Sequence, residues 1–188
     1  MKEQKRFVKS ADTSTPVSNS RGEIEKMLRR YGAVGFAVQQ EFDAAGTGTR
    51  IVVQFVVPDS LEKNAGKVPV SLPVDVRRIY DALYGRPTRW AINEETKRGG
   101  YVHNPNGYDA KKMMQAERVA WRNLLLWIDA ALSAATAGLQ TITEAFFAHT
   151  MVALEDGQTM RLADYMERTA GALAPGVRAL LAAPAETE

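Results

Sequence analysis

The feature that most constrains the fold is a long amphipathic pattern over residues 109–137. Apolar residues recur there at spacings of three and four, the period of an α-helix with one side facing a core. Asp109 stands where an N-cap is expected, and Gly138 stands where a left-handed residue would end the helix. The segment therefore predicts one long helix, and the rest of the chain must cover its apolar side.

The apolar side of this helix is wider than one neighbouring element would cover. It consists of Met113, Ala116, Ala120, Leu124, Trp127, Ile128, Ala131, Leu132 and Ala135, and it is widened by Trp121 and Leu125. A following short helix adds two aromatic residues. We define the candidate interaction surface as Trp121, Leu125, Phe146 and Phe147. Either these residues share one core with the sheet, or they form a docking face for a protein or a second copy of the chain.

Alternation with a period of two predicts strands before the long helix. The pattern covers 34–39 and 50–57, with a Gly-rich loop at 43–49 between them, and again 68–74. Prolines alternate with the apolar residues of the third run, which predicts an edge strand or an extended segment. We therefore expect an α+β domain, a small antiparallel sheet of about three strands packed on one long helix, with shorter flanking helices.

The flanking helices follow from capping signals. Ser20 and Glu23 have the spacing of a capping box before a helix that would end at Gly32. Asp75 is placed to cap a helix over 76–83. Another capping-box pattern precedes the short helix with the two phenylalanines. A brief strand at 151–154 and a helix near 160–172 complete the predicted elements.

The length of 188 residues favours a single core. We expect a flexible basic arm at 1–18, one domain at 19–174 and a tail at 175–188. With 45% hydrophobic and 24% charged residues the composition is that of an ordinary globular protein. The absence of cysteine excludes disulfides, thiolate metal sites and cysteine nucleophiles. No apolar run resembles a membrane span or a signal peptide, which favours the cytoplasm.

Charge is unevenly distributed along the chain. Residues 1–30 carry eight basic and four acidic side chains, residues 86–112 carry six and three, and residues 139–188 carry three and seven. A basic half that faces an anionic partner is one interpretation. The other is a set of solvated surfaces that keep the protein soluble.

Residues 86–108 lack a long period and predict an extended loop with room for a short hairpin. Loops of this length in compact domains are often functional. Cations and aromatic residues alternate through the loop and into the long helix, a mixture that suits single-stranded nucleic acid because cations neutralise phosphates while rings stack on bases. The candidate nucleic-acid-binding residues are Arg86, Arg89, Trp90, Lys97, Arg98, Tyr101, Tyr108, Lys111 and Lys112. Glu94, Glu95 and Asp109, and the lack of a nucleic-acid-binding signature, argue against it.

Little in the chain indicates catalysis. Gly46 and Gly48 lie between two strands, where a hairpin turn is expected and a phosphate loop is not. His103 is a candidate base or metal ligand, but a histidine without a second ligand nearby more often belongs to a surface loop. His149 follows two phenylalanines, as a core or boundary histidine would. No catalytic residue, metal or cofactor is expected.

From Ser20 to Met166 the order of elements resembles a group of uncharacterised small proteins of phages, prophages and other mobile elements. The resemblance is carried by RGEIEKMLRRYGA at 21–33 and by VAWRNLLLWIDAALSAATAGLQTITEAFFAHTMVALEDGQTMRLADYM at 119–166. These motifs are structural, namely a capped helix, a W-R-x-L-L helix, an F-x-A-H segment and a D-G-x-T turn. The resemblance implies a context of replication, recombination, regulation or interference with host defence, and no catalytic residue.

Together these features favour a non-enzymatic protein that contacts nucleic acid, or a complex engaged on it, through residues 86–112. The alternative is a protein-interaction module, such as a phage-encoded inhibitor of a host enzyme, that acts through its apolar or acidic C-terminal half. The expected partners are single-stranded nucleic acid, a host or phage protein, or a second copy of the chain, and no membrane.

Overall fold

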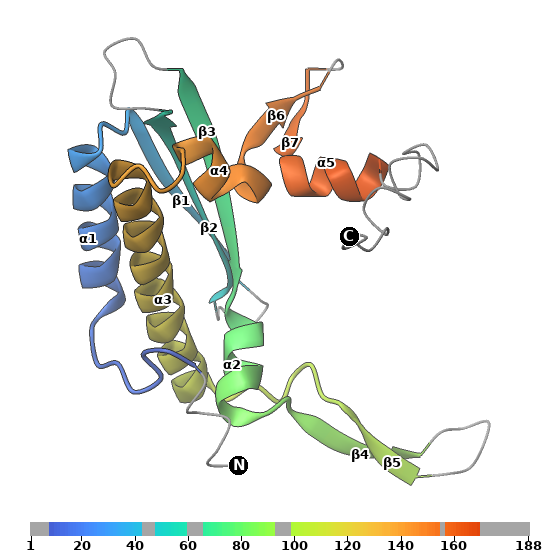
Figure 1. The fold of residues 1–188 in the computed structure, drawn as a ribbon. Helices are drawn as coiled ribbons and strands as arrows, with labels where there is room; N and C mark the ends of the chain where they lie inside the picture. The colour runs from blue at the N-terminus through green and yellow to red at the C-terminus, as the bar shows by residue number, and fades with distance from the viewer. Residues whose placement is uncertain (1–7, 43–47, 60–65, 93–98, 155–156, 170–188) are drawn as a thin grey trace, which may run out of the picture.

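The computed structural model describes residues 8–42, 48–59, 66–92, 99–154 and 157–169. Helices and antiparallel strands give an α+β fold, as the sequence predicts (Figure 1). In chain order the elements are α1 (Val17–Arg30), β1 (Gly35–Phe42), β2 (Gly48–Pro58), β3 (Lys67–Asp75), α2 (Val76–Tyr84), β4 (Thr88–Ile92), β5 (Gly99–His103), α3 (Ala110–Thr136), α4 (Ile142–Phe146), the 3-10 turn η2 (Phe147–His149), β6 (Met151–Ala153), β7 (Thr159–Arg161) and α5 (Leu162–Thr169).

The main sheet has three antiparallel strands in the order β1-β2-β3. Alternate residues of the central strand are buried, each at most 1% exposed, namely Ile51, Val53, Phe55 and Val57. Their cross-strand neighbours on the same face include Phe36 and Val38 in β1 and Val70 and Leu72 in β3. Residues opposite each other in a sheet point to the same side, so the alternation read from the sequence selects the buried face.

β3 is an edge strand, as its prolines predict. Apart from its pairing with β2, its one backbone bridge in the described chain joins Val70 to Thr150. Pro69 and Pro73 have no N–H to offer a further strand, so they limit growth of the sheet at this edge. On the face of β2 away from the core, Val52 and Val56 are half buried. That face is therefore only partly covered.

α3 is the helix predicted at 109–137, and it packs on the buried face of the sheet. α1 lies beside it on the same face, and α2 and α4 contact it nearer its two ends (Figure 1). Ten of its side chains are buried, from Met113 to Leu132. Because several elements share this helix, its wide apolar side is covered without a second protein.

This packing corrects three of the four residues of the candidate interaction surface. Trp121, Leu125 and Phe146 are buried in the core, and Phe147 alone is exposed, at 50%. The ring of Phe146 meets Phe55 edge-on at 5.4 Å between centroids. The shared core, which was the other explanation of the aromatic excess, accounts for these three side chains. Trp127 also differs from the prediction, since it is 40% exposed at the margin of the core.

Most predicted helix ends are confirmed. Asp75 accepts hydrogen bonds from the backbone N–H groups of the first turn of α2, and Asp109 does the same at α3 through Lys112 N, at 2.9 Å. Gly32 and Gly138 follow α1 and α3 with φ of 81° and 73°, a conformation that glycine adopts without strain. The predicted capping box of Thr141 and Glu144 is present at α4. Each of these helix ends depends on residues only a few positions apart, so the sequence pattern is sufficient to predict it.

The beginning of α1 differs from the prediction. The helix starts at Val17, after Pro16, and Ser20 is a buried helical residue whose hydroxyl has no hydrogen-bond partner in the described structure. Val17 packs against the core, which places the first turn earlier than the Ser20 signal. Part of the segment expected as a flexible arm contacts α3, because Gln115 donates to Ala11 O and Thr13 O at 3.1 and 2.9 Å, while residues 1–7 lie outside the described residues.

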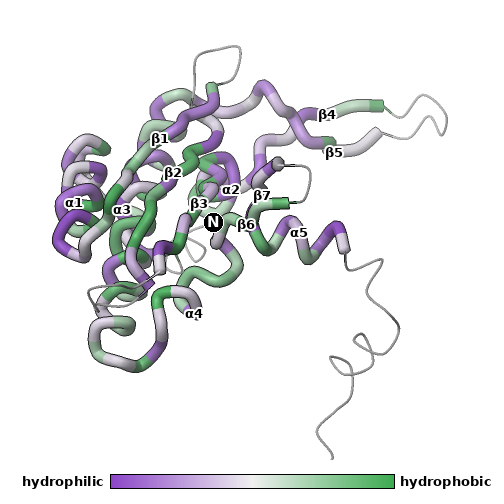
Figure 2. Tube along the Cα trace, turned by 90° about the horizontal axis from the view of Figure 1, so that it is seen from above, coloured by the Kyte–Doolittle hydropathy of each residue, from purple (hydrophilic) through white to green (hydrophobic). Residues whose placement is uncertain are grey.

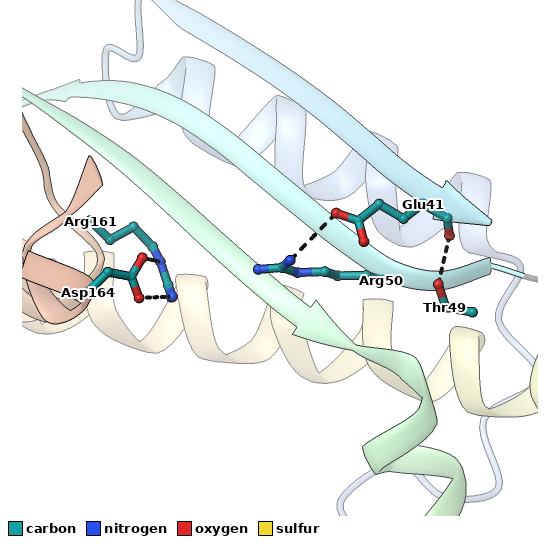
Figure 3. A network of polar contacts seen from close by, with 5 residues as sticks. All are labelled: Glu41, Thr49, Arg50, Arg161 and Asp164. Carbon is teal, nitrogen blue, oxygen red and sulfur yellow. Dashed lines mark hydrogen bonds and ion pairs between the residues drawn. The ribbon is translucent and has the colours of Figure 1, made fainter. Parts of the chain in front are cut away.

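The small sheet β6-β7 and helix α5 extend from the β3 edge of the main sheet (Figure 1). β6 confirms the brief strand predicted at 151–154, whereas β7 was not predicted. Arg161 binds both carboxylate oxygens of Asp164, at 2.8 and 2.5 Å, and thereby joins β7 to α5 (Figure 3). Arg50 lies 3.6 Å from Glu41 in the neighbouring strand β1. In the described part of the chain, no helix is long and apolar enough to cross a membrane.

The adjacent phenylalanines of α4 and η2 provide a test of the core. Phe146→Ala should lower the free energy of unfolding by about 3 to 5 kcal/mol, because it leaves a cavity beside Phe55. Phe147→Ala should change it by no more than about 0.5 kcal/mol, because that ring is half exposed. Urea denaturation of the two variants measures both changes. An equal decrease in the free energy of unfolding of both variants would contradict the burial of Phe146 and the exposure of Phe147.

Candidate nucleic-acid interface

Residues 86–108, predicted as an extended loop with room for a short hairpin, contain an antiparallel hairpin formed by β4 and β5. It leaves the body between the end of α2 and the start of α3 and extends into solvent as an arm (Figure 1). Figure 2 shows the same arm from above, with hydrophobic residues of β4 at its far end. The pairing runs from Thr88 opposite His103 to Ile92 opposite Gly99, and Asn104 N continues it by donating to Pro87 O at 2.9 Å.

The register separates the side chains of the arm into two faces. Trp90 stands opposite Tyr101, and Ile92 stands opposite Gly99, so the large rings and Ile92 share one face. Arg89 stands opposite Val102 on the other face. We call the side with Trp90, Ile92 and Tyr101 the aromatic face. On the described strands of the arm, the two rings therefore lie on one side of the ribbon and Arg89 lies on the other.

The two rings of the aromatic face contact each other and solvent. Trp90 and Tyr101 meet edge to face, with centroids 5.3 Å apart and planes at 80°. They remain 61% and 75% exposed. Gly99 makes room for the indole, because a Cβ at this position would lie 2.2 Å from Cζ2 of Trp90. Because Gly99 has no side chain, the indole of Trp90 can lie directly against the neighbouring strand.

Tyr108 anchors the base of the arm to α2. Its ring packs edge-on against Tyr80 at 4.9 Å and lies 5.1 Å from the guanidinium of Arg77. Its hydroxyl is 3.4 Å from Nε2 of His103 at the end of β5. Burial raises the pKa of Tyr108, and the carboxylate of Asp81 raises it further, so the phenol stays protonated at neutral pH. Tyr108 is thus a positioning residue of the hairpin base.

A second contact ties the start of α3 to the same helix. Asp109 N donates to the hydroxyl of Tyr80 at 3.4 Å, and the ammonium of Lys112 lies 5.4 Å from the ring centre of Tyr84. Burial raises the pKa of Tyr84, and the neighbouring Tyr80 raises it further. These contacts place the first turn of α3, and hence its lysines, next to the point where the arm begins.

The structure therefore divides the nine candidate residues. Six are exposed on the arm or at its base, namely Arg86, Arg89, Trp90, Tyr101, Lys111 and Lys112. Tyr108 is half buried and packs against the core at the base of the arm. Lys97 and Arg98 lie outside the described residues, as do Glu94 and Glu95.

Sequence reasoning missed Ile92 and Val102 on the arm, and Arg77 and Tyr80 beneath it. A signal for Ile92 existed, because Thr88, Trp90 and Ile92 alternate with Arg89 and Ala91. The second set could not be found in the same way. Contacts between α2 and the segment before α3 join residues about thirty positions apart, which no local pattern encodes.

The two histidines lie in different parts of the fold, His103 at the end of β5 and His149 at the end of η2. His103 contacts Tyr108 at the hairpin base, where no cluster of three potential metal ligands occurs among the described residues. His149 packs against Trp127 at 5.5 Å, and its Nδ1 is buried with no hydrogen-bond partner in the described chain. Burial lowers the pKa of His149, Arg161 lowers it further, and Asp164 acts in the opposite direction. It is therefore neutral at pH 7.

Comparison with known proteins returns no match to this chain, whether with protein-family models, curated proteins or solved structures. The residues of the arm and its base are therefore the basis for a functional proposal.

The contact between Gly99 and Trp90 can be tested directly. Gly99→Ala should displace the indole, because the added methyl group would overlap its six-membered ring, whereas Gly100→Ala meets nothing within 4 Å. The backbone and indole N–H resonances of Trp90 should shift strongly in the first variant and little in the second, in ¹⁵N-correlated NMR spectra. A matching response in both variants would show that the ring does not rest on Gly99.

The environment of His149 predicts a pH dependence of stability. Its folded-state pKa lies below the ordinary value of 6.5, so the unfolded chain binds the proton more readily. The stability contributed by the neutral ring is complete above this value and is lost as pH falls through the folded-state pKa. His149→Phe should therefore lose less stability than the natural chain between about pH 7.5 and about pH 5.5, measured by urea denaturation. If the variant and the natural chain lost the same stability over this pH range, the lowered pKa of His149 would be contradicted.

Proposed function

We propose that this protein binds single-stranded nucleic acid through the β4-β5 arm and the adjoining first turn of α3. The observation that carries the proposal is a pair of aromatic rings, Trp90 and Tyr101, held in contact on a projecting ribbon and left largely exposed to solvent. A mobile-element context, and a location in the cytoplasm, belong to the same proposal.

Exposure of these two rings to water is unfavourable in free energy, and a ligand that covered them would offset this. An isolated two-stranded hairpin is marginally stable in water, and no other described helix or strand packs extensively on this one. The rings of Trp90 and Tyr101 gain little from each other beyond one edge contact. Bases that stack on such rings contribute about 1 to 3 kcal/mol each, whatever their sequence.

Exposed cations around the arm supply attraction to phosphates. Arg89 lies on the face opposite the rings, Arg86 precedes β4, and Lys111 and Lys112 lie in the first turn of α3. Residues 86–112 as a whole carry six basic and three acidic side chains. A strand that stacks on the aromatic face would therefore have cations at the base of the arm and along its other side, within reach of its phosphates.

A protein partner is the second candidate, and one observation favours it. Ile92 and Val102 are apolar and exposed on the same arm, at 63% and 44%, and nucleic acid gives such side chains little to bind. Ile92 extends the aromatic face, whereas Val102 lies on the opposite face, and an exposed face of aromatic and aliphatic side chains resembles a protein-docking surface. The interaction would then use the arm, since Trp121, Leu125 and Phe146 lie in the core. An inhibitor of a host enzyme remains one form of this second proposal.

The proposal is tested with a fluorescent oligonucleotide and two pairs of arginine substitutions. Affinity for a single-stranded oligonucleotide should fall steeply with salt, and Arg86→Ala with Arg89→Ala should weaken binding and flatten the salt dependence by about one to two released ions. Arg29→Ala with Arg30→Ala is the matched control, because it removes the same charge from the opposite end of the molecule (Figure 1). Equal losses in both pairs would indicate nonspecific attraction only.

Trp90→Ala with Tyr101→Ala separates stacking from charge. This variant should lose about tenfold or more in affinity, because two stacking contacts are removed, while the salt dependence stays unchanged. Fluorescence anisotropy measures both quantities. An aromatic variant that binds as tightly as the natural chain, or a natural chain that fails to bind at low salt, would overturn the proposal and leave the protein-partner reading.

A further inference from the structure

A cavity of about 430 Å³ lies at the opposite end of α3 from the arm. It is bounded by the last turn of α3, the end of β2, the end of α1 and the start of α4. Gly138 reverses the chain after α3, and the segment to Thr141 crosses to α4 without closing the space. Its volume is within the range of sites that bind small molecules, which is about 300 to 1,000 Å³.

The walls of the cavity are mainly apolar. Val57, Leu132 and Ile142 belong to the buried core and form its inner side, while Leu139 stands at the rim with 81% of its surface exposed. Burial of such a surface by a ligand would be favourable by about 25 cal/mol for each Å² removed from water. The cavity therefore suits a ligand with an apolar body.

The charged groups of the lining have one sign. Asp59 and Glu144 are its charged residues, and no lysine, arginine or histidine is present among the side chains that line it in the described structure. The C-terminal end of α3 adds the negative end of a helix dipole, and its last turn carries no basic residue to neutralise it. An anionic ligand, including nucleic acid, would therefore be repelled here.

Both carboxylates are held in place by bonds to one oxygen and keep the other available. Asp59 Oδ1 accepts from Thr143 N and Oγ1 at 3.2 and 2.7 Å, and Glu144 Oε2 accepts from Thr141 N and Oγ1 at 2.7 and 3.1 Å. In the described chain, neither Asp59 Oδ2 nor Glu144 Oε1 has a partner. The hydrogen bonds from Thr141 lower the pKa of Glu144, and the negative charge of Asp59 acts in the opposite direction.

We propose that this cavity binds a small organic cation with an apolar body, such as a primary alkylamine in its ammonium form. The ammonium group would donate to the free oxygens of Asp59 and Glu144 and relieve their mutual repulsion. The alkyl chain would cover Leu132, Leu139 and Ile142. This site is independent of the nucleic-acid interface, because it shares none of its residues.

The test uses the full chain and probes that differ only in their head group, namely hexylamine, hexanol and hexanoate. Hexylamine should shift the methyl resonances of Leu132, Leu139 and Ile142 in a saturable manner, and hexanoate should bind at least about tenfold more weakly, because one charge-assisted hydrogen bond is worth about that factor. Equal binding of all three probes, no saturable shift, or shifts away from these residues would overturn the proposal.

Variants assign the effect to the carboxylates and to the cavity. Asp59→Asn should weaken hexylamine binding about tenfold while its remaining oxygen still accepts from Thr143, so the fold is kept. Asp129→Asn, on the exposed side of α3, is the matched control and should bind as the natural chain does. Ala135→Leu should also weaken binding, because it narrows the cavity without touching either carboxylate. Unchanged affinity in both cavity variants would overturn the assignment.

A lysine side chain of a protein carries the same head group, and a further probe distinguishes it. N-acetyl-lysine amide should bind more weakly than hexylamine, because its peptide groups replace part of the apolar body in a site with apolar walls. Equal or tighter binding of this probe would overturn the small-molecule assignment and indicate a peptide ligand.

Discussion

Ten buried side chains along α3 hold the molecule together, since the sheet, α1, α2 and α4 all pack on this helix. Each element contributes an apolar side that would be unstable alone, and each finds its partner on α3. The N-terminal residues depend on the same helix through Gln115, and the hairpin base depends on it through Asp109. Loss of α3 would therefore remove the shared packing partner of α1, α2 and α4.

The fold could be predicted where the determining interaction is local. Caps at Asp75 and Asp109, left-handed glycines and the alternation in β2 each depend on residues a few positions apart, and all are present in the structure. The start of α1 was predicted wrongly because Ser20 gives a cap signal, whereas packing of Val17 on a distant core decides where the helix begins. Tertiary contacts also decide that Trp121 is buried, which a helical pattern alone leaves open.

The sequence predicted which types of residue the candidate site contains, but not how these residues are arranged in space. The sequence placed cations and rings in one segment, but their division onto two faces depends on which residues of β4 and β5 stand opposite each other. That register becomes visible only when both strands are paired, because a shift of one residue would exchange the faces. The packing of Tyr108 could not be predicted for a related reason, because its ring contacts Tyr80 and Arg77 of an earlier helix.

The length of α3 sets the separation of the two proposed sites. At about 1.5 Å per residue, its 27 residues span about 40 Å, with the arm at one end and the acidic cavity at the other. Ligands at the two ends would not touch, and both could be held at once at a fixed spacing. Communication between them would require α3 to shift as a rigid unit against the sheet, so each end is open to redesign without direct disturbance of the other.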